Sequence, residues 1–318
     1  MVHTAGPCWK SRRCDTETLS CGTSAALARS EPVQPLPPKD HAAPSVFRPE
    51  HLLREARRQR GLPEQNVPAL CVLDPDGDLV RALRRDGRAH LSPGWACYHI
   101  ELFDFALADG TMAGIVGCAV GAPFAALVAE QLFASGCRML VSITSAGRII
   151  DVGEPPYAVL IEQALRDEGT SLHYLPPDAP GVVHAPDMLL LASLERNLRD
   201  RLHGTGVALH RGATWTTDAP YRETEAAIAA AHASGVLAVE MEAAALDEFA
   251  TARGVPVACF AHVTNSMGQQ PGADFEKGEA EGTVTALRII EVTATALRSA
   301  WPKPDPVAAR WHGKEPVH

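Results

Sequence analysis

The chain has 318 residues, of which 46% are hydrophobic and 21% charged, and its formal net charge is −9. This composition is typical of a globular protein with one large or two small domains, and an acidic balance without a basic stripe argues against binding to nucleic-acid backbones. No apolar run reaches the roughly 20 residues that span a bilayer, and no apolar segment of a secretory signal follows the basic N-terminus. The eight cysteines form no paired C-x-x-C zinc pattern, so we expect a reduced, cytoplasmic protein.

Composition divides the chain into three parts. Residues 1–45 are rich in Ser, Thr, Pro and charge. Such a segment buries too little apolar surface to fold alone, so we expect a disordered tail. We expect residues 46–300 to form one folded domain and residues 301–318 to form a Pro-rich C-terminal extension.

Between these ends, short apolar strands alternate with amphipathic helices. The expected strands are 68–73, 111–118, 138–143, 157–161, 206–211, 237–239 and 257–263. The expected helices are 121–135, 186–202, 222–234, 243–253 and 276–299. The alternation predicts an α/β fold with a mixed, mostly parallel central sheet flanked by helices. Ligands of such sheets bind at the carboxyl ends of strands, where the unusual residues of this chain fall.

The first such segment is Asp76-Gly-Asp-Leu-Val-Arg81, directly after the first strand. Glycine allows a tight turn and brings backbone N–H groups close to an anion. Arg81 lies one helical turn further on and can donate paired hydrogen bonds to a phosphate. An ordinary Asp-Gly turn with a solvated Arg is the alternative interpretation.

The second segment is Gly117-Cys-Ala-Val-Gly-Ala-Pro123, which lies between an expected strand and an expected helix. Glycines after a strand and a proline early in the helix are typical of a strand-loop-helix turn. The spacing differs from G-x-G-x-x-G, so the segment does not indicate a dinucleotide cofactor. The thirteen histidines of the chain are scattered, and no metal site is expected.

The most informative segment is Val236 to Leu246, in which Glu240, Met241 and Glu242 lie between an apolar strand and an Ala-rich helix. Two carboxylates among apolar neighbours cost several kcal/mol unless they are paired. A sugar with adjacent hydroxyls is one such partner, because a carboxylate can accept a hydrogen bond from each. The alternative is that both acids flank or cap the helix from its solvent side.

The sequence Val-Glu-Met-Glu-Ala-Ala at 239–244 resembles the ribose-binding signature of the nucleoside phosphorylase superfamily, in its purine nucleoside and uridine phosphorylase branch. The other segments follow in the family's order over roughly residues 68–298. The resemblance implies that residues 46–300 are a nucleoside phosphorylase-like catalytic domain. Met241 would then pack on the sugar, Glu242 would bind its hydroxyls, and Val120 would lie beside it.

Two segments resemble the phosphate-binding motifs of that family. Gly77 and Arg81 match its Gly-Asp-x-x-Arg loop, and Ser145, in Ser142-Ile-Thr-Ser-Ala-Gly147, matches its phosphate-binding Ser or Thr. The family usually has an Arg where this chain has Ser142. One phosphate-binding cation is therefore missing unless Arg148 or a residue such as His99 replaces it.

Two further segments match the family's base-binding region. Residues 212–224 resemble its Ser-x-Asp segment, which places Thr217 beside the base, while Arg222 could hydrogen-bond the base edge. Trp215 or Tyr221 could stack on the base, with core packing as the alternative for Trp215. The polar segment 165–177 also resembles uridine phosphorylases, and we expect it to be a loop that organises structure beside the site.

Asn265 stands where hexameric purine phosphorylases carry an Asp that protonates the base. An Asn has no titratable proton to donate, but it can hydrogen-bond N7 and O6 of a 6-oxopurine. An Asn at this position also occurs in uridine phosphorylases. We therefore expect 6-oxopurine nucleosides or uridine as substrates rather than adenosine.

The resemblance implies cleavage of the N-glycosidic bond by phosphate, which yields the free base and ribose 1-phosphate. Glu242, Asn265 and Arg81 are the expected catalytic residues, phosphate is the co-substrate, and no cofactor is expected. Departures from the family at Ser142, Ala119 and Asn265 leave two alternatives open. One is a nucleosidase of the same fold that uses water, and the other is a non-catalytic nucleoside-binding protein.

Subunits of this family pair, and residues of one chain complete the site of its neighbour. His99 precedes the apolar run 100–105, near where such a contact residue would fall. The resemblance therefore implies a homo-oligomer, either a dimer or a trimer of dimers, with a possible neighbour-subunit contact at His99.

Overall fold

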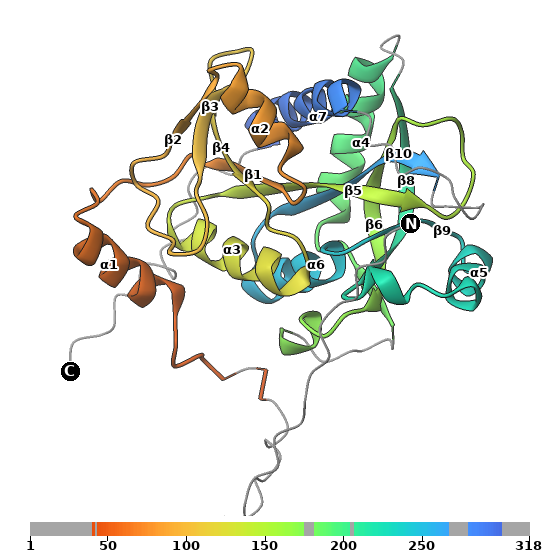
Figure 1. The fold of residues 1–318 in the computed structure, drawn as a ribbon, viewed down its shortest axis with the longest axis horizontal. Coiled ribbons are helices and arrows are strands. Elements are labelled where there is room, and N and C mark those ends of the chain that lie inside the picture. Colours follow the sequence, from red (N-terminus) through yellow and green to blue (C-terminus); the bar gives the residue numbers. More distant parts are fainter. Residues whose placement is uncertain (1–39, 42, 175–180, 204–206, 267–278, 301–318) are drawn as a thin grey trace, which may run out of the picture. The chain divides into compact units, whose positions relative to one another are not determined.

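In the computed structural model, strands and helices alternate along the described residues, which are 40–41, 43–174, 181–203, 207–266 and 279–300 (Figure 1). The strands are β1 Leu70–Asp74, β2 Ala89–Leu91, β3 Phe103–Ala106, β4 Met112–Gly117, β5 Met139–Arg148, β6 Tyr157–Asp167, β7 Val182–His184, β8 Ala208–Thr217, β9 Val236–Glu240 and β10 Val257–Ser266. The helices are α1 Pro49–Arg60, α2 Asp78–Arg85, α3 Ala122–Ala134, α4 Met188–Leu202, α5 Glu225–Ala233, α6 Ala243–Arg253 and α7 Glu279–Ala300. Two short 3₁₀ turns, η1 Ser171–His173 and η2 Pro220–Arg222, complete the described elements.

The strands form one mixed sheet, part of which closes into a ring. Its order is β10-β6-β8-β9-β5-β1-β4-β3-β2, and β10 also pairs with β5, so that these two strands complete a ring with β6, β8 and β9. β1 is parallel to both β4 and β5, whereas β3 is antiparallel to β4 and β9 is antiparallel to β5. The predicted α/β fold with a mixed, mostly parallel sheet is confirmed.

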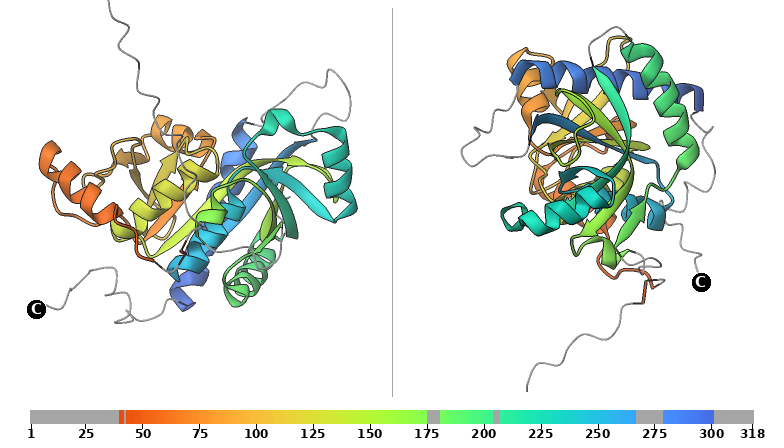
Figure 2. Two further views of the ribbon diagram at one scale, coloured as in Figure 1. Left: turned by 90° about the horizontal axis from the view of Figure 1, so that it is seen from below. Right: turned by 90° about the vertical axis from the view of Figure 1, so that its right-hand side faces the viewer.

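Helices cover both faces of this sheet. α2, α4 and α7 pack together on one face, and α3 packs with α6 on the other, with α1 beside α3 (Figures 1 and 2). In β1, Val72 belongs to the first apolar core and Leu73 to the second. Since both faces of β1 are covered, consecutive residues are apolar, as in a buried parallel strand.

Two glycines start helices at the ends of strands. Gly77 precedes α2 with a φ of 75°, and Gly121 precedes α3 with a φ of 88°. Glycine adopts such left-handed conformations without the steric cost of a side chain. The turns after β1 and β4 therefore place two helix N-termini, with their backbone N–H groups, at neighbouring positions along the edge of the sheet.

Several strands extend beyond the ranges predicted from sequence, and β5, β6 and β8 do so by five or six residues. β5 continues to Arg148, so the predicted strand 138–143 ends too early. The extension pairs with β10 along its length and with β9 at Gly147. β6 and β8 run in register to Asp167 and Thr217, so the predicted loop 165–177 begins too early. Long-range pairing, which local sequence does not report, sets these limits.

The predicted helix 222–234 is wrong at its N-terminus. Tyr221 and Arg222 lie in the 3₁₀ turn η2, and α5 begins at Glu225. Thr224 caps α5, because its Oγ1 accepts a hydrogen bond from Ala227 N at 3.2 Å. The helices α1 and α2 and the strands β2, β3 and β7 were not predicted.

The predicted tail and extension fall largely outside the described residues, since 1–39 and 301–318 are not described. The predicted domain limits therefore stay predictions. Within the described residues, no helix combines the length and the apolar character that crossing a bilayer would require.

Candidate active site

The site is built around the carboxylate of Glu242, at the turn between β9 and α6. Glu242 Oε1 accepts a hydrogen bond from Gly121 N at 2.7 Å, and Oε2 accepts one from Thr144 Oγ1 at 2.8 Å. The residue is only 1% exposed. Three elements that are distant in sequence, namely the α6 turn, β5 and the turn before α3, therefore meet at this side chain.

Glu240 has a structural role. Its Oε2 accepts hydrogen bonds from Glu242 N at 2.8 Å and from Ala243 N at 2.7 Å, which caps the start of α6. Its Oε1 accepts from the hydroxyls of Thr216 and Thr214. The idea that both acids flank the helix from its solvent side is wrong, because both are buried. Glu240 nevertheless caps the helix, from within the core.

Burial and neighbouring charge change the acidity of Glu242. Burial first, and then the negative charges of Glu240 and Asp76, together raise its pKa to about 8, against the opposing hydrogen bonds from Gly121 and Thr144. Each carboxylate oxygen has a second lone pair available. Donors on a ligand, such as sugar hydroxyls, would stabilise the ionised form. Because the carboxylate is almost fully enclosed, a sugar reaches it only if the side chains that cover it shift.

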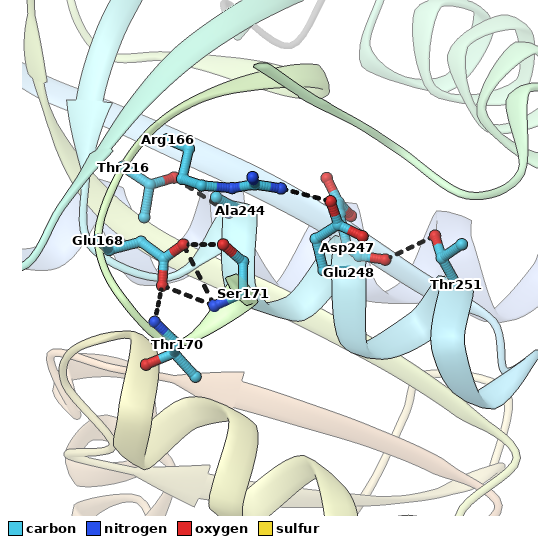
Figure 3. Close-up of polar contacts among 9 residues, drawn as sticks. All are labelled: Arg166, Glu168, Thr170, Ser171, Thr216, Ala244, Asp247, Glu248 and Thr251. Carbon is cyan, nitrogen blue, oxygen red and sulfur yellow. Dashed lines mark hydrogen bonds and ion pairs between the residues drawn. The ribbon is translucent and has the colours of Figure 1, made fainter. Parts of the chain in front are cut away.

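Polar contacts to neighbouring strands hold α6 in place (Figure 3). Thr216 Oγ1 of β8 accepts a hydrogen bond from Ala244 N at 3.0 Å, in the first turn of the helix. Arg166 of β6 pairs with Glu248 at 2.5 Å, and both side chains are largely buried. The helix is thus fixed at its first turn and near its middle, which keeps Glu242 in a defined position.

The predicted ribose-binding neighbours lie next to this carboxylate. Val120 directly precedes Gly121 and is 50% exposed. A side-chain carbon added at Gly121 would lie 4.0 Å from Met241 Cε. Val120 and Met241 are therefore both close to Gly121, whose N–H binds Glu242, and the structure brings the predicted ribose-binding residues near one another.

The predicted phosphate loop is the turn between β1 and α2. Asp74 Oδ2 accepts a hydrogen bond from Val80 N at 2.9 Å and so stabilises the turn. The Arg81 guanidinium pairs with the Asp78 carboxylate and donates to Asp76 O at 2.9 Å. A side chain at Gly77 would collide, because its first carbon would lie 2.6 Å from Cys118 Sγ and 2.8 Å from Arg81 Nη1.

Ser145 lies close to this loop and contacts an acid that sequence reasoning missed. Ser145 N donates a hydrogen bond to Asp76 Oδ2 at 3.0 Å. Burial raises the pKa of Asp74 to about 7, with the negative charges of Asp76 and Asp78 adding to the rise. The sequence shows Asp76 as an acid of the segment Asp76–Arg81, but it does not show that Ser145 on β5 is its partner.

The structure shows what occupies the position of the missing cation. Ser142 is 2% exposed, and among the described residues its hydroxyl has no hydrogen-bond partner. Arg148 binds Asp151 Oδ1 at 3.2 Å and Gly153 O at 3.3 Å. Arg148 is thus already paired with an acid, and Ser142 supplies no charge.

The predicted base-binding residues are dispersed. Trp215 is 5% exposed, packs in an apolar cluster with Ile149 and Val239, and donates from Nε1 to Asp167 Oδ2 at 3.1 Å. This favours core packing over base stacking. The Thr217 hydroxyl also donates to Asp167, at 3.3 Å. Tyr221 is 99% exposed, so its ring is not packed against the buried Glu242.

Arg222 is exposed in the same turn as Tyr221, so the structure does not bring it to Glu242 either. His99 is exposed between β2 and β3, and its N–H donates to Cys97 Sγ at 3.4 Å. Its predicted role toward a neighbouring subunit stays a prediction.

Strand β10 carries the remaining predicted residue and one that was missed. Asn265 pairs in register with Gly147 of β5, but its side chain lies outside the described part of the structure. His262 pairs in register with Ser145 and is 6% exposed. Burial lowers the pKa of His262, and the charge of Asp76 opposes this effect, which places the two groups near one another.

Comparison with known proteins agrees with this arrangement. The sequence profile of the Phosphorylase superfamily matches residues 69–298. A guanosine phosphorylase of Halorubrum lacusprofundi is 29% identical over 199 residues, which cover 59% of this chain and 78% of that protein. The structure of uridine phosphorylase from Vibrio fischeri ES114, in complex with 6-hydroxy-1-naphthoic acid, matches with a TM-score of 0.59 at 20% identity, covering 74% of this chain and 93% of the other.

The likeness to the uridine phosphorylase shows the fold, and the profile match shows the family. The matched range includes β1 to β10 and every predicted site residue. The family predicted from the sequence motifs is therefore confirmed, and the chain belongs to the phosphorylase superfamily.

Proposed function

We propose that this protein cleaves the N-glycosidic bond of a 6-oxopurine nucleoside or of uridine, with phosphate as the acceptor. The products would be the free base and ribose 1-phosphate. The observation that carries the proposal is the Glu242 carboxylate, which is fixed between Gly121 N and Thr144 Oγ1 beside the residues Val120 and Met241. The match to a protein named guanosine phosphorylase supports the 6-oxopurine class.

In the proposed reaction, Glu242 accepts hydrogen bonds from the ribose hydroxyls and fixes the sugar. Ser145 and the Gly77–Arg81 loop place a phosphate oxygen below the anomeric carbon, so that two bound reactants combine as one unit. The bond from the anomeric carbon to the base nitrogen breaks, and the bond to the phosphate oxygen forms. The negative phosphate stabilises the positive charge that develops on the sugar, while Asn265 donates a hydrogen bond to the leaving base.

Hydrolysis is a second candidate, and two observations favour it. The Asp76 carboxylate already accepts the hydrogen bond of Ser145 N, and Ser142 stands where the family usually has a cation. Water in place of phosphate would give free ribose and the same base. We rank this reaction second because Gly77 and Arg81 match the phosphate loop.

The test is incubation of the full chain with inosine, guanosine, adenosine and uridine, with and without phosphate, followed by chromatography of the free base. Base release that requires phosphate, with ribose 1-phosphate as co-product, supports the proposal. Equal release without phosphate establishes hydrolysis. No release, together with thermal stabilisation by a nucleoside, identifies a binding protein and overturns the proposal.

We further propose that the protein acts as a homo-oligomer, with His99 contributing to a neighbouring subunit's site. The exposure of His99 in the single chain supports this. Light scattering during turnover tests it, because an active monomer contradicts it.

A further inference from the structure

The Asp76 carboxylate lies at the position where an anion would meet Ser145. Asp76 sits in the turn between β1 and α2, two residues before the helix begins. Its Oδ2 accepts the hydrogen bond of Ser145 N at 3.0 Å. A backbone N–H is a common ligand for a bound phosphate oxygen. Here, an acid of the protein itself uses it.

Charge in the surrounding segment does not favour a second anion. Residues 74–81 contain three aspartates and one arginine, Arg81. That guanidinium pairs with Asp78 and also donates to Asp76 O. Within residues 74–81, the one cation is thus already paired with an aspartate. A phosphate at Ser145 would approach the Asp76 carboxylate, and like charges a few ångströms apart repel strongly in a partly buried site.

Asp76 also lies close to the other proposed ligands. Its negative charge contributes to the raised pKa of Glu242 and opposes the lowered pKa of His262. His262 pairs in register with Ser145, whose N–H binds Asp76, and Thr144, the residue before Ser145, binds Glu242. Asp76 therefore contacts the residue proposed to hold phosphate and lies near the residue proposed to hold the sugar.

We propose that Asp76 is an internal competitor of phosphate and determines how tightly this chain binds its acceptor. Phosphate binds only when the Asp76 carboxylate leaves Ser145 N, and the energy of that displacement weakens phosphate binding. Asp76 therefore determines specificity for the acceptor and does not itself react. The inference rests on the proposed function, because that function assigns the phosphate to Ser145.

The experiment measures the affinity of the full chain for inorganic phosphate by isothermal titration calorimetry, without nucleoside. Asp76→Asn removes the charge and keeps an oxygen that can accept the Ser145 hydrogen bond. Asp200→Asn makes the same change in net charge at an exposed position of α4 and serves as the matched control. We expect Asp76→Asn to bind phosphate at least tenfold more tightly than the wild type, and Asp200→Asn to change affinity less than twofold.

In turnover assays, the KM for phosphate should fall in Asp76→Asn while kcat stays within a few-fold of the wild type. Unchanged or weaker phosphate binding by Asp76→Asn overturns the inference. The inference is also overturned if Asp76→Asn loses base release that needs no phosphate and gains no phosphate affinity. That result would show that Asp76 activates water. If Asp76→Asn fails to fold by circular dichroism, Asp76→Ser provides the same measurement.

The binding readout separates this inference from the proposed function. Tighter phosphate binding by Asp76→Asn, in a protein that releases no base from any nucleoside, supports the role of Asp76 and contradicts the proposed reaction. Phosphate-dependent base release by the wild type, with unchanged phosphate binding in Asp76→Asn, supports the proposed reaction and contradicts the role of Asp76.

Discussion

Two strand-to-helix turns, β1–α2 and β9–α6, carry the same arrangement of acids with different consequences. In each turn, the first acid ends the strand and binds backbone N–H groups of the following turn, as Asp74 does with Val80 and Glu240 does with Ala243. The second acid, two residues later, binds a backbone N–H of a separate segment: Asp76 binds Ser145 N and Glu242 binds Gly121 N.

The turns differ in their enclosure and charge. Glu242 is 1% exposed, and the donors to its carboxylate in the described part of the chain, Gly121 N and Thr144 Oγ1, are neutral. Asp76 is half-buried, and the guanidinium of Arg81 reaches its backbone carbonyl. An enclosed acid with neutral partners suits neutral hydroxyl donors, whereas an acid in a partly exposed, charged turn affects the binding of ions. The same local motif thus serves two chemistries through its surroundings.

The largest expected effect tests the second acid of β9–α6. Glu242→Ala should lower kcat/KM for base release by about 10²- to 10⁴-fold, because hydrogen bonds from two sugar hydroxyls to a charged acceptor are lost. Steady-state kinetics measure this, with Glu225→Ala on the exposed start of α5 as the control. Near wild-type kinetics for Glu242→Ala would remove this residue from the site.

The first acid of the same turn should affect stability instead. Glu240→Ala should lower the free energy of unfolding by about 3 kcal/mol, because it leaves the N–H groups of Glu242 and Ala243 without their acceptor in a buried site. Urea denaturation followed by circular dichroism measures the change. A loss below about 0.5 kcal/mol would show that the cap is dispensable.

The corresponding change in β1–α2 should be smaller. Asp74→Ala should cost about 1–2 kcal/mol, since its side chain chiefly serves the N–H of Val80, whereas the carboxylate of Glu240 accepts four hydrogen bonds. The same denaturation series measures this. If Asp74→Ala is more destabilising than Glu240→Ala, the number of hydrogen bonds does not explain the difference between the turns.

The smallest expected effect is a pH dependence of nucleoside binding. Sugar hydroxyls donate to the ionised form of Glu242, and burial first, with the charge of Glu240 second, raises the pKa of that acid to about 8. Affinity for an uncleaved nucleoside analogue should therefore rise with pH up to about 8, by less than about tenfold per pH unit. Calorimetry between pH 6 and pH 9 tests this, because that range brackets the raised Glu242 pKa of about 8.

The Glu242→Gln variant isolates this effect, since its affinity for the analogue should not rise with pH.

The stability of the folded protein should change with pH in the opposite direction to the affinity. A carboxylate with a raised pKa in the folded state favours folding least when it is ionised, so its destabilising effect grows as pH rises from the ordinary value of 4.5 to about 8. A wild-type affinity that is flat across this range would contradict the assignment of Glu242 to the sugar.

Much of the fold followed from local sequence. Strands such as 68–73 and 257–263 were predicted from their continuous apolar residues. The sheet requires such residues because both of its faces are buried. The strand ends at Arg148, Asp167 and Thr217 were not predicted, because polar residues there stay in the sheet through pairing with distant strands. The starts of α2 and α5 depended on a positive-φ glycine and a threonine cap.

The candidate site also has features that the sequence predicted and features that only the tertiary structure decided. Its motifs, with Glu242, Ser145, Gly77 and Arg81, were found because each requires particular residue types at fixed spacing. The tertiary structure alone decided that Glu240 caps α6, that Trp215 packs in the core, and that Asp76 reaches Ser145. Hydrogen bonds and burial depend on atoms brought together from several strands, and no local stretch of sequence contains all of those atoms.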